Sequence, residues 1–130
     1  MPRFRRLTRS RGASALEFAL VLPLLLLLVM GILDWGYYFF AEQIVVNAAR
    51  EGARAGSLAT LDSALAQAEA TSVASEYLTR AGLDATRAVV ATTVGADSVA
   101  VAITFPTGSL TGLSTVIVPS AARATAEMRR

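Results

Sequence analysis

Three consecutive stretches near the N-terminus decide the fold: RGASALEF (11–18), ALVLPLLLLLVMGIL (19–33) and DWGYYFF (34–40). Phe18 to Leu33 is sixteen residues without a charge. As a helix these residues cover roughly 24 Å. A bilayer core is about 30 Å thick and takes about 20 apolar residues. The stretch therefore predicts a membrane-spanning helix that begins near Ala13 and accepts one carboxylate, Glu17, close to its N-terminal end.

Charge is distributed unevenly along the 130 residues. Residues 1–12 hold five Arg and no acid, whereas residues 13–130 hold seven Arg and ten acids, a net charge of −3. A basic arm is compatible with nucleic-acid binding, but this one directly precedes an apolar run. The positive-inside rule explains it better, with the N-terminus in the cytoplasm and the C-terminal part outside. Nucleic acid is therefore not an expected partner.

The apolar run is expected to stay in the protein as an anchor. No small-x-small cleavage site follows Leu33, as a secretory signal peptide would require. The run is followed by Asp34, Trp35, Tyr37 and Tyr38, which suit a membrane–water interface because aromatic rings lie in lipid while polar tips meet water. The alternative is a buried helix of a soluble core.

Two features within the long helix leave alternatives open. Pro23 frees one backbone carbonyl, so it either kinks the helix or is a passive feature. Beyond the span the helix becomes amphipathic and is expected to end at Gly56. Its small residues Ala48, Gly52 and Gly56 recur every four positions and permit close helix packing. They pack either on a partner's helix or, as we favour, on the protein's own sheet.

Residues 57–130 predict a small head built from both helix and strand. Asp62 is a suitable N-cap for a second helix that ends at about Ala81. The expected apolar stripe of this helix comprises Leu61, Leu65, Ala68, Val73, Tyr77 and Leu78. Alternation with a period of two predicts strands at 87–94, 98–105 and 121–128. The expected fold class is α+β, with a long N-terminal transmembrane helix whose C-terminal half packs on a second helix and a small three-stranded antiparallel sheet.

The composition argues against catalysis. The chain has no Cys and no His, which excludes disulfides, thiol chemistry, the usual zinc sites and His-based acid–base catalysis. The acids are spread singly, and no Gly-rich phosphate loop follows a strand. We therefore expect no catalytic residues, no metal and no cofactor.

The segment from Gly12 to Phe18, followed by the apolar run, resembles the type III signal of the type IV pilin superfamily. More narrowly, residues 11–55 resemble TadE-like pseudopilins of tight-adherence (Flp) pilus systems. The shared features are the start at Ala15 to Phe18, Pro23 within a Leu-rich span, the exit Asp34-Trp35-Gly36, and the motif Asn47 to Arg54. In the superfamily a prepilin peptidase cuts after the Gly. The resemblance thus implies cleavage between Gly12 and Ala13, which makes Glu17 the fifth mature residue.

The resemblance also implies a pilin-like fold in three parts: a cleaved basic leader (1–12), a long helix that is transmembrane in its first half (13–56) and a periplasmic α+β head (57–130). The implied role is that of a minor pilin in the bacterial inner membrane that primes, caps or initiates a filament in adhesion. Implied partners are membrane lipid, prepilin peptidase, other pilin-like subunits (the major pilin and other Tad minor pilins) and the inner-membrane assembly platform.

Glu17 and Phe18 are the expected recognition residues. Glu17 either pairs with the α-ammonium of a neighbouring subunit, or reaches the membrane surface or guides the peptidase. The alternative to the pilin interpretation is an uncleaved, single-pass anchored protein whose head binds a secretion or envelope partner.

Overall fold

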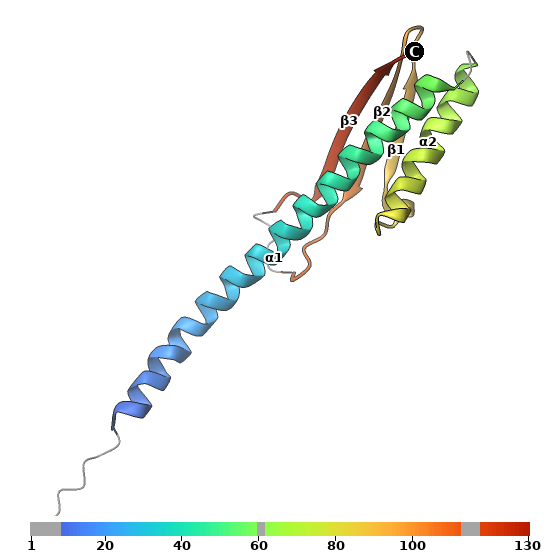
Figure 1. Ribbon diagram of the computed structural model, residues 1–130. Coiled ribbons are helices and arrows are strands. Elements are labelled where there is room, and N and C mark those ends of the chain that lie inside the picture. Colours follow the sequence, from blue (N-terminus) through green and yellow to red (C-terminus); the bar gives the residue numbers. More distant parts are fainter. Residues whose placement is uncertain (1–8, 60–61, 113–117) are drawn as a thin grey trace, which may run out of the picture.

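The computed structural model describes residues 9–59, 62–112 and 118–130. The elements follow in the order α1 (Arg9–Leu58), α2 (Ser63–Arg80), a short 3₁₀ turn η1 (Ala85–Arg87), β1 (Val89–Val94), β2 (Ser98–Pro106) and β3 (Ala121–Arg129). Helix α1 extends far beyond the other elements, which all gather along its C-terminal half (Figure 1). The expected α+β class, with one long helix, a second helix and a three-stranded antiparallel sheet, is confirmed.

Helix α1 is 50 residues long, or about 75 Å. It begins before Gly12 and continues two residues past Gly56, so it is longer at both ends than the sequence predicts. The helix also continues through Pro23 without a break (Figure 1). The backbone therefore does not melt at Pro23. The surrounding leucines are strong helix formers, which helps the helix to tolerate one missing backbone donor.

Helix α2 begins and ends where the sequence predicts. The Asp62 carboxylate accepts a hydrogen bond from the backbone N–H of Ala64 at 2.8 Å, which makes it the N-cap. At the other end, Gly82 adopts a φ of +89°, and the N–H of Leu83 bonds to the carbonyl of Leu78. This left-handed glycine and its hydrogen bonds terminate the helix in the usual way.

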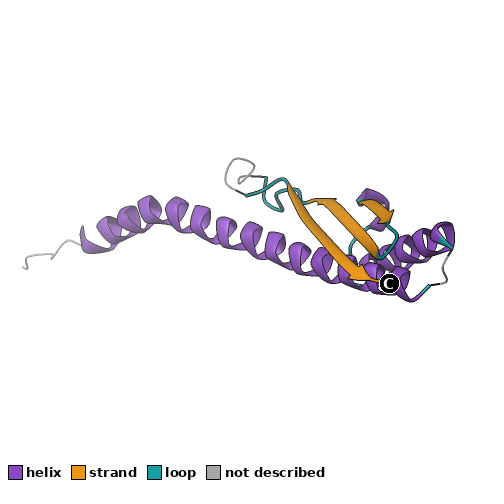
Figure 2. Ribbon diagram, turned by 90° about the horizontal axis from the view of Figure 1, so that it is seen from above, coloured by secondary structure: helices purple, strands orange, loops and turns teal. Residues whose placement is uncertain are grey.

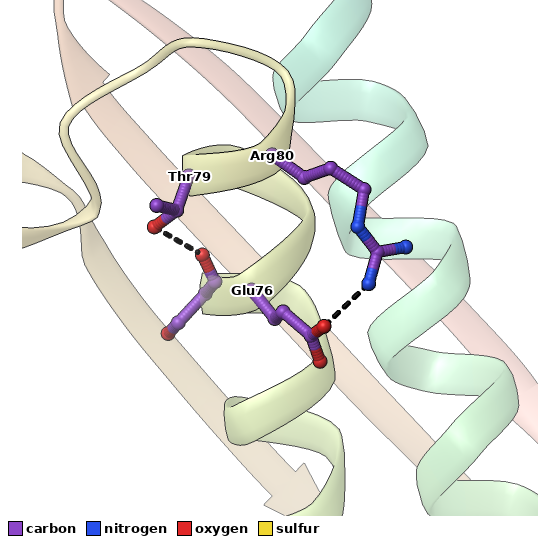
Figure 3. A network of polar contacts seen from close by, with 4 residues as sticks. Glu76, Thr79 and Arg80 are labelled. Carbon is purple, nitrogen blue, oxygen red and sulfur yellow. Dashed lines mark hydrogen bonds and ion pairs between the residues drawn. The ribbon is translucent and has the colours of Figure 1, made fainter.

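The outer surface of α2 is a solvated polar face. Arg80 forms an ion pair with Glu76 one turn earlier, and the Thr79 hydroxyl donates to the Ser75 carbonyl at 3.1 Å (Figure 3). Both side chains of the ion pair are largely exposed. Exposed pairs of this kind contribute little to stability, so we assign this network no role beyond the helix surface.

The buried face of α2 differs from the predicted stripe. The helix buries Ala66, Ala70, Ala74 and Leu78, whereas Leu65 is 58% exposed. The reason lies on the facing helix, because a methyl group added to Gly52 would lie only 2.8 Å from the Ala70 carbonyl oxygen. Two backbones this close leave room for alanine side chains and exclude leucine. Of the predicted apolar stripe, Leu65 and Ala68 are therefore not buried, and Leu61 lies outside the described residues.

The sheet has the order β1-β2-β3, and both pairings are antiparallel. Strand β2 buries Val99, Val101, Ile103 and Phe105, which alternate along the strand and therefore share one face. The sheet lies along one side of α1 (Figure 2). Its buried face completes a single core with the alanines and Val45 of α1.

The first strand begins two residues later than predicted, at Val89. The preceding residues form η1, whose N-cap Asp84 accepts hydrogen bonds from the Thr86 hydroxyl at 2.7 Å and the Thr86 N–H at 3.0 Å. These bonds, with a smaller contribution from Arg87, hold the pKa of Asp84 below its usual value. The capped turn thus holds residues 85–87 out of the sheet.

Candidate functional site

The N-terminal half of α1 is an uncovered apolar surface. Every side chain from Gly12 to Val29 is exposed, including the run of leucines, and Leu20 is 74% exposed. By length and composition, α1 can cross a membrane. An apolar surface of this extent is not stable in water, so it requires either lipid or other apolar helices around it.

Glu17 and Phe18 lie on this surface with their side chains exposed. Within the part of the chain that the structure describes, no basic side chain forms an ion pair with Glu17. An ionised carboxylate in apolar surroundings is costly unless it is paired or hydrogen-bonded. The described fold thus provides no such partner for Glu17, and any partner must come from outside it.

The predicted cleavage site, Gly12-Ala13, lies within the first turns of α1. A methyl group added to Gly12 would have no neighbour within 4 Å. Glycine inside a helix costs about 0.5–1 kcal/mol relative to alanine. Since no contact with a described residue requires glycine at position 12, the described fold gives no reason for this choice.

The small residues Ala48, Gly52 and Gly56 lie at the opposite end of α1 and are buried. A methyl group added to Gly56 would lie 2.9 Å from Ala70 Cβ and 2.9 Å from Val99 Cγ1. The two glycines thus allow α1 to approach the protein's own α2, and Gly56 also approaches its own β2. The structure therefore places this face inside the head, where a partner's helix cannot reach it.

Asp34 lies in a clasp that the sequence does not reveal. This residue, predicted at the membrane–water interface, is 2% exposed. Oδ2 accepts hydrogen bonds from the hydroxyls of Ser109 (2.7 Å) and Thr111 (2.8 Å), and Oδ1 accepts one from the Thr111 N–H (3.0 Å). We call Asp34, Ser109 and Thr111 the loop clasp. It fastens the loop between β2 and β3 to the middle of α1.

Aromatic side chains surround the same part of α1. The rings of Trp35, Tyr38 and Phe39 form a cluster with centroid separations of 5.5–5.8 Å. Trp35, Tyr37 and Tyr38 are half-buried, whereas Phe39 and Phe40 are exposed. The predicted interface residues thus lie together on the segment where the helix meets the head.

Sequence reasoning missed Ser109 and Thr111. They are 75 and 77 residues away from Asp34, and no periodicity connects a loop residue to a helix residue across such a distance. The available signals were one acid at the end of an apolar run and a hydroxyl-rich segment, residues 106–120, that contains no charge. Neither signal by itself identifies the contact.

A profile of the family described as TadE-like protein matches residues 12–54. About a third of the chain, residues 12–54, is therefore similar to TadE-like proteins. This match confirms the resemblance that the sequence motifs indicated. The TadE-like segment contains Gly12, Glu17 and Asp34, and it ends just before Gly56. No curated protein and no solved structure shows significant similarity to the chain.

Proposed function

We propose that this protein is a minor pilin, or pseudopilin, of a Tad pilus system, and that it acts by subunit assembly rather than catalysis. The TadE-like match indicates involvement in such a system. The single observation that carries the finer proposal is the uncovered apolar half of α1, which bears one carboxylate without a described partner. Other pilin-like subunits would supply both an apolar surface and a positive charge.

In this proposal the protein is inserted in the bacterial inner membrane with its N-terminus in the cytoplasm and its head in the periplasm. The five Arg of residues 1–12 support this orientation. The exposed run from Gly12 to Val29 supports insertion. The assembly platform and the other Tad subunits would then meet the protein within or just above the membrane, where it would prime, cap or initiate a filament that serves in adhesion.

A prepilin peptidase would remove residues 1–12 before assembly. The open surroundings of Gly12 are compatible with this step, because no described residue lies within 4 Å of a methyl group added there. Cleavage creates an α-ammonium at Ala13, whose unperturbed pKa is roughly 8. In an assembly, the Glu17 carboxylate would pair with this group on a neighbouring subunit, where the low dielectric strengthens the attraction.

The experiment is co-expression with a prepilin peptidase, followed by N-terminal sequencing and intact mass of the membrane-extracted chain. We expect the wild type to begin at Ala13 and Gly12→Leu to remain full length. Gly31→Leu is the matched control, because Gly31 also has no neighbour within 4 Å but lies away from the site. A wild-type chain that keeps residues 1–12 would contradict the proposal and favour an uncleaved anchor whose head binds an envelope partner.

A further inference from the structure

The loop between β2 and β3 reaches further toward the N-terminal end of α1 than any other described part of the head (Figure 1). It meets α1 at Asp34, the first charged residue after the apolar run. In the sequence, residues 106–120 contain no charged residue. An uncharged loop therefore lies at the point where the helix was expected to leave the membrane.

The loop clasp removes the charge of Asp34 from the surface. With the carboxylate buried and hydrogen-bonded, the side chains that remain exposed near this level include Leu110 (64%), Phe39 (53%) and Phe40 (52%). Leu110 lies between the two clasp residues of the loop, so the clasp also fixes its position. The apolar surface of α1 thus continues past Asp34 to Phe40.

Several polar groups of the described loop residues, 107–112 and 118–120, form hydrogen bonds within the protein. The Thr107 N–H bonds to the Ser120 carbonyl and the Thr107 hydroxyl to the Pro119 carbonyl, both at 2.9 Å. The Gly112 N–H donates to Ser109 Oγ at 2.8 Å. Irregular backbone is tolerated near lipid when its polar groups have partners in the protein. These hydrogen bonds, with those of the loop clasp, lower the cost of placing residues 107–112 in a water-poor environment.

We propose that residues 107–112 form a second membrane contact, in which the loop lies in the head-side interface of the bilayer and the Leu110 side chain enters the lipid. The lipid-covered part of α1 then extends to Phe40. Phe18 to Phe40 is 23 residues, or about 35 Å of helix, which exceeds a bilayer core of about 30 Å.

The inference rests on the membrane insertion in the proposed function, and labelled single-Cys variants test it. Because the chain has no Cys, Leu110→Cys carries one environment-sensitive fluorophore in the full-length protein. We would reconstitute it in phosphatidylethanolamine–phosphatidylglycerol vesicles and measure quenching by nitroxide lipids. Leu27→Cys, within the span, is the positive control. Ala96→Cys, exposed in the β1–β2 hairpin, is the negative control.

We expect the label at position 110 to be quenched several times more strongly than at position 96, most of all by nitroxides near the headgroups. Combining Leu110→Cys with Ser109→Ala and Thr111→Val removes the hydroxyl donors of the clasp without changing α1. This variant should lose most of the quenching at position 110, while Leu27→Cys with the same two changes stays quenched.

Quenching at position 110 no stronger than at position 96, in a protein that floats with the vesicles, would overturn the inference and leave the proposed function standing. Shielding of the label by another subunit instead of lipid would likewise overturn the inference and leave the proposed function standing. If quenching at position 110 is undiminished in the variant without the clasp hydroxyls, the loop clasp does not position Leu110. A chain that does not float with vesicles at all would contradict membrane insertion itself.

Discussion

Two carboxylates on α1 have opposite surroundings. Asp34 is buried and accepts hydrogen bonds from Ser109 and Thr111, so the fold itself satisfies its charge. Glu17 is exposed on an apolar surface and has no ion pair with a described residue. A charged group in apolar surroundings requires a partner. Asp34 therefore holds the β2–β3 loop against α1 within the chain, whereas Glu17 is the candidate for contacts between subunits.

Glu17→Gln retains the shape of the side chain and removes the charge. We expect normal insertion and cleavage but loss of co-purification with other pilin-like subunits, because the neutral amide cannot pair with an α-ammonium. Glu51→Gln is the matched control, since Glu51 is an exposed acid on the head part of α1. Pull-down from membranes and a piliation assay measure the outcome. A Glu17→Gln chain that retains its partners and supports piliation would rule out the pairing.

At the scale of elements, the glycines of α1 fall into two classes. A methyl group added to Gly12, Gly31 or Gly36 would have no neighbour within 4 Å. A methyl group added to Gly52 or Gly56 would lie within 3 Å of an atom of α2. The second class allows the close approach of two helices and explains why α2 buries alanines. The same residue type therefore has a packing role in the head and no such role in the apolar half.

Gly52→Ala should destabilise the head, because the added methyl would lie 2.8 Å from the Ala70 carbonyl oxygen and 2.9 Å from Ala74 Cβ. Overpacking of this kind costs typically about 1–3 kcal/mol. Gly36→Ala has open space and should leave the unfolding midpoint unchanged or raise it, since alanine favours helix. Thermal unfolding in detergent, followed by circular dichroism, distinguishes the two variants. Equal midpoints would show that the helices can separate without cost.

The whole molecule is a rod with two chemically different ends. The described N-terminal half of α1 is apolar and exposed, and the C-terminal half carries the compact head (Figure 1). The basic leader precedes the apolar end in the sequence, with five Arg before Gly12. This distribution of charge and apolar surface favours one orientation in a membrane, with the head on the side opposite the leader.

The orientation can be measured with reporters fused after Arg130. A periplasm-dependent reporter should be active and a cytoplasm-dependent one inactive. Replacing the five leader Arg by Gln should increase the fraction of inverted chains, because the positive charges fix the cytoplasmic side. Activity of the cytoplasm-dependent reporter in the wild-type fusion would contradict the proposed orientation.

The sequence by itself determined the elements and the similarity of residues 12–54 to the TadE-like family. Hydrophobic runs, the N-cap Asp62, the helix stop at Gly82 and the period-two alternation of β2 are local patterns, so α1, α2 and the strands follow from short-range physics. The TadE-like motifs are likewise contiguous in the chain. The start of β1 was misplaced by two residues because the Asp84–Thr86 hydrogen bonds form a turn that competes with the strand.

Only the tertiary structure decided which faces meet. The buried stripe of α2 depends on glycines in another helix, and the partners of Asp34 come from a loop some 75 residues later in the chain. Neither contact has a local signature, because hydrophobic periodicity reports how strongly a face prefers burial and not what covers it. For the same reason the sequence predicted Asp34 at the membrane interface without indicating that its carboxylate is buried, whereas the loop clasp buries the charge and lets the apolar surface continue to Phe40.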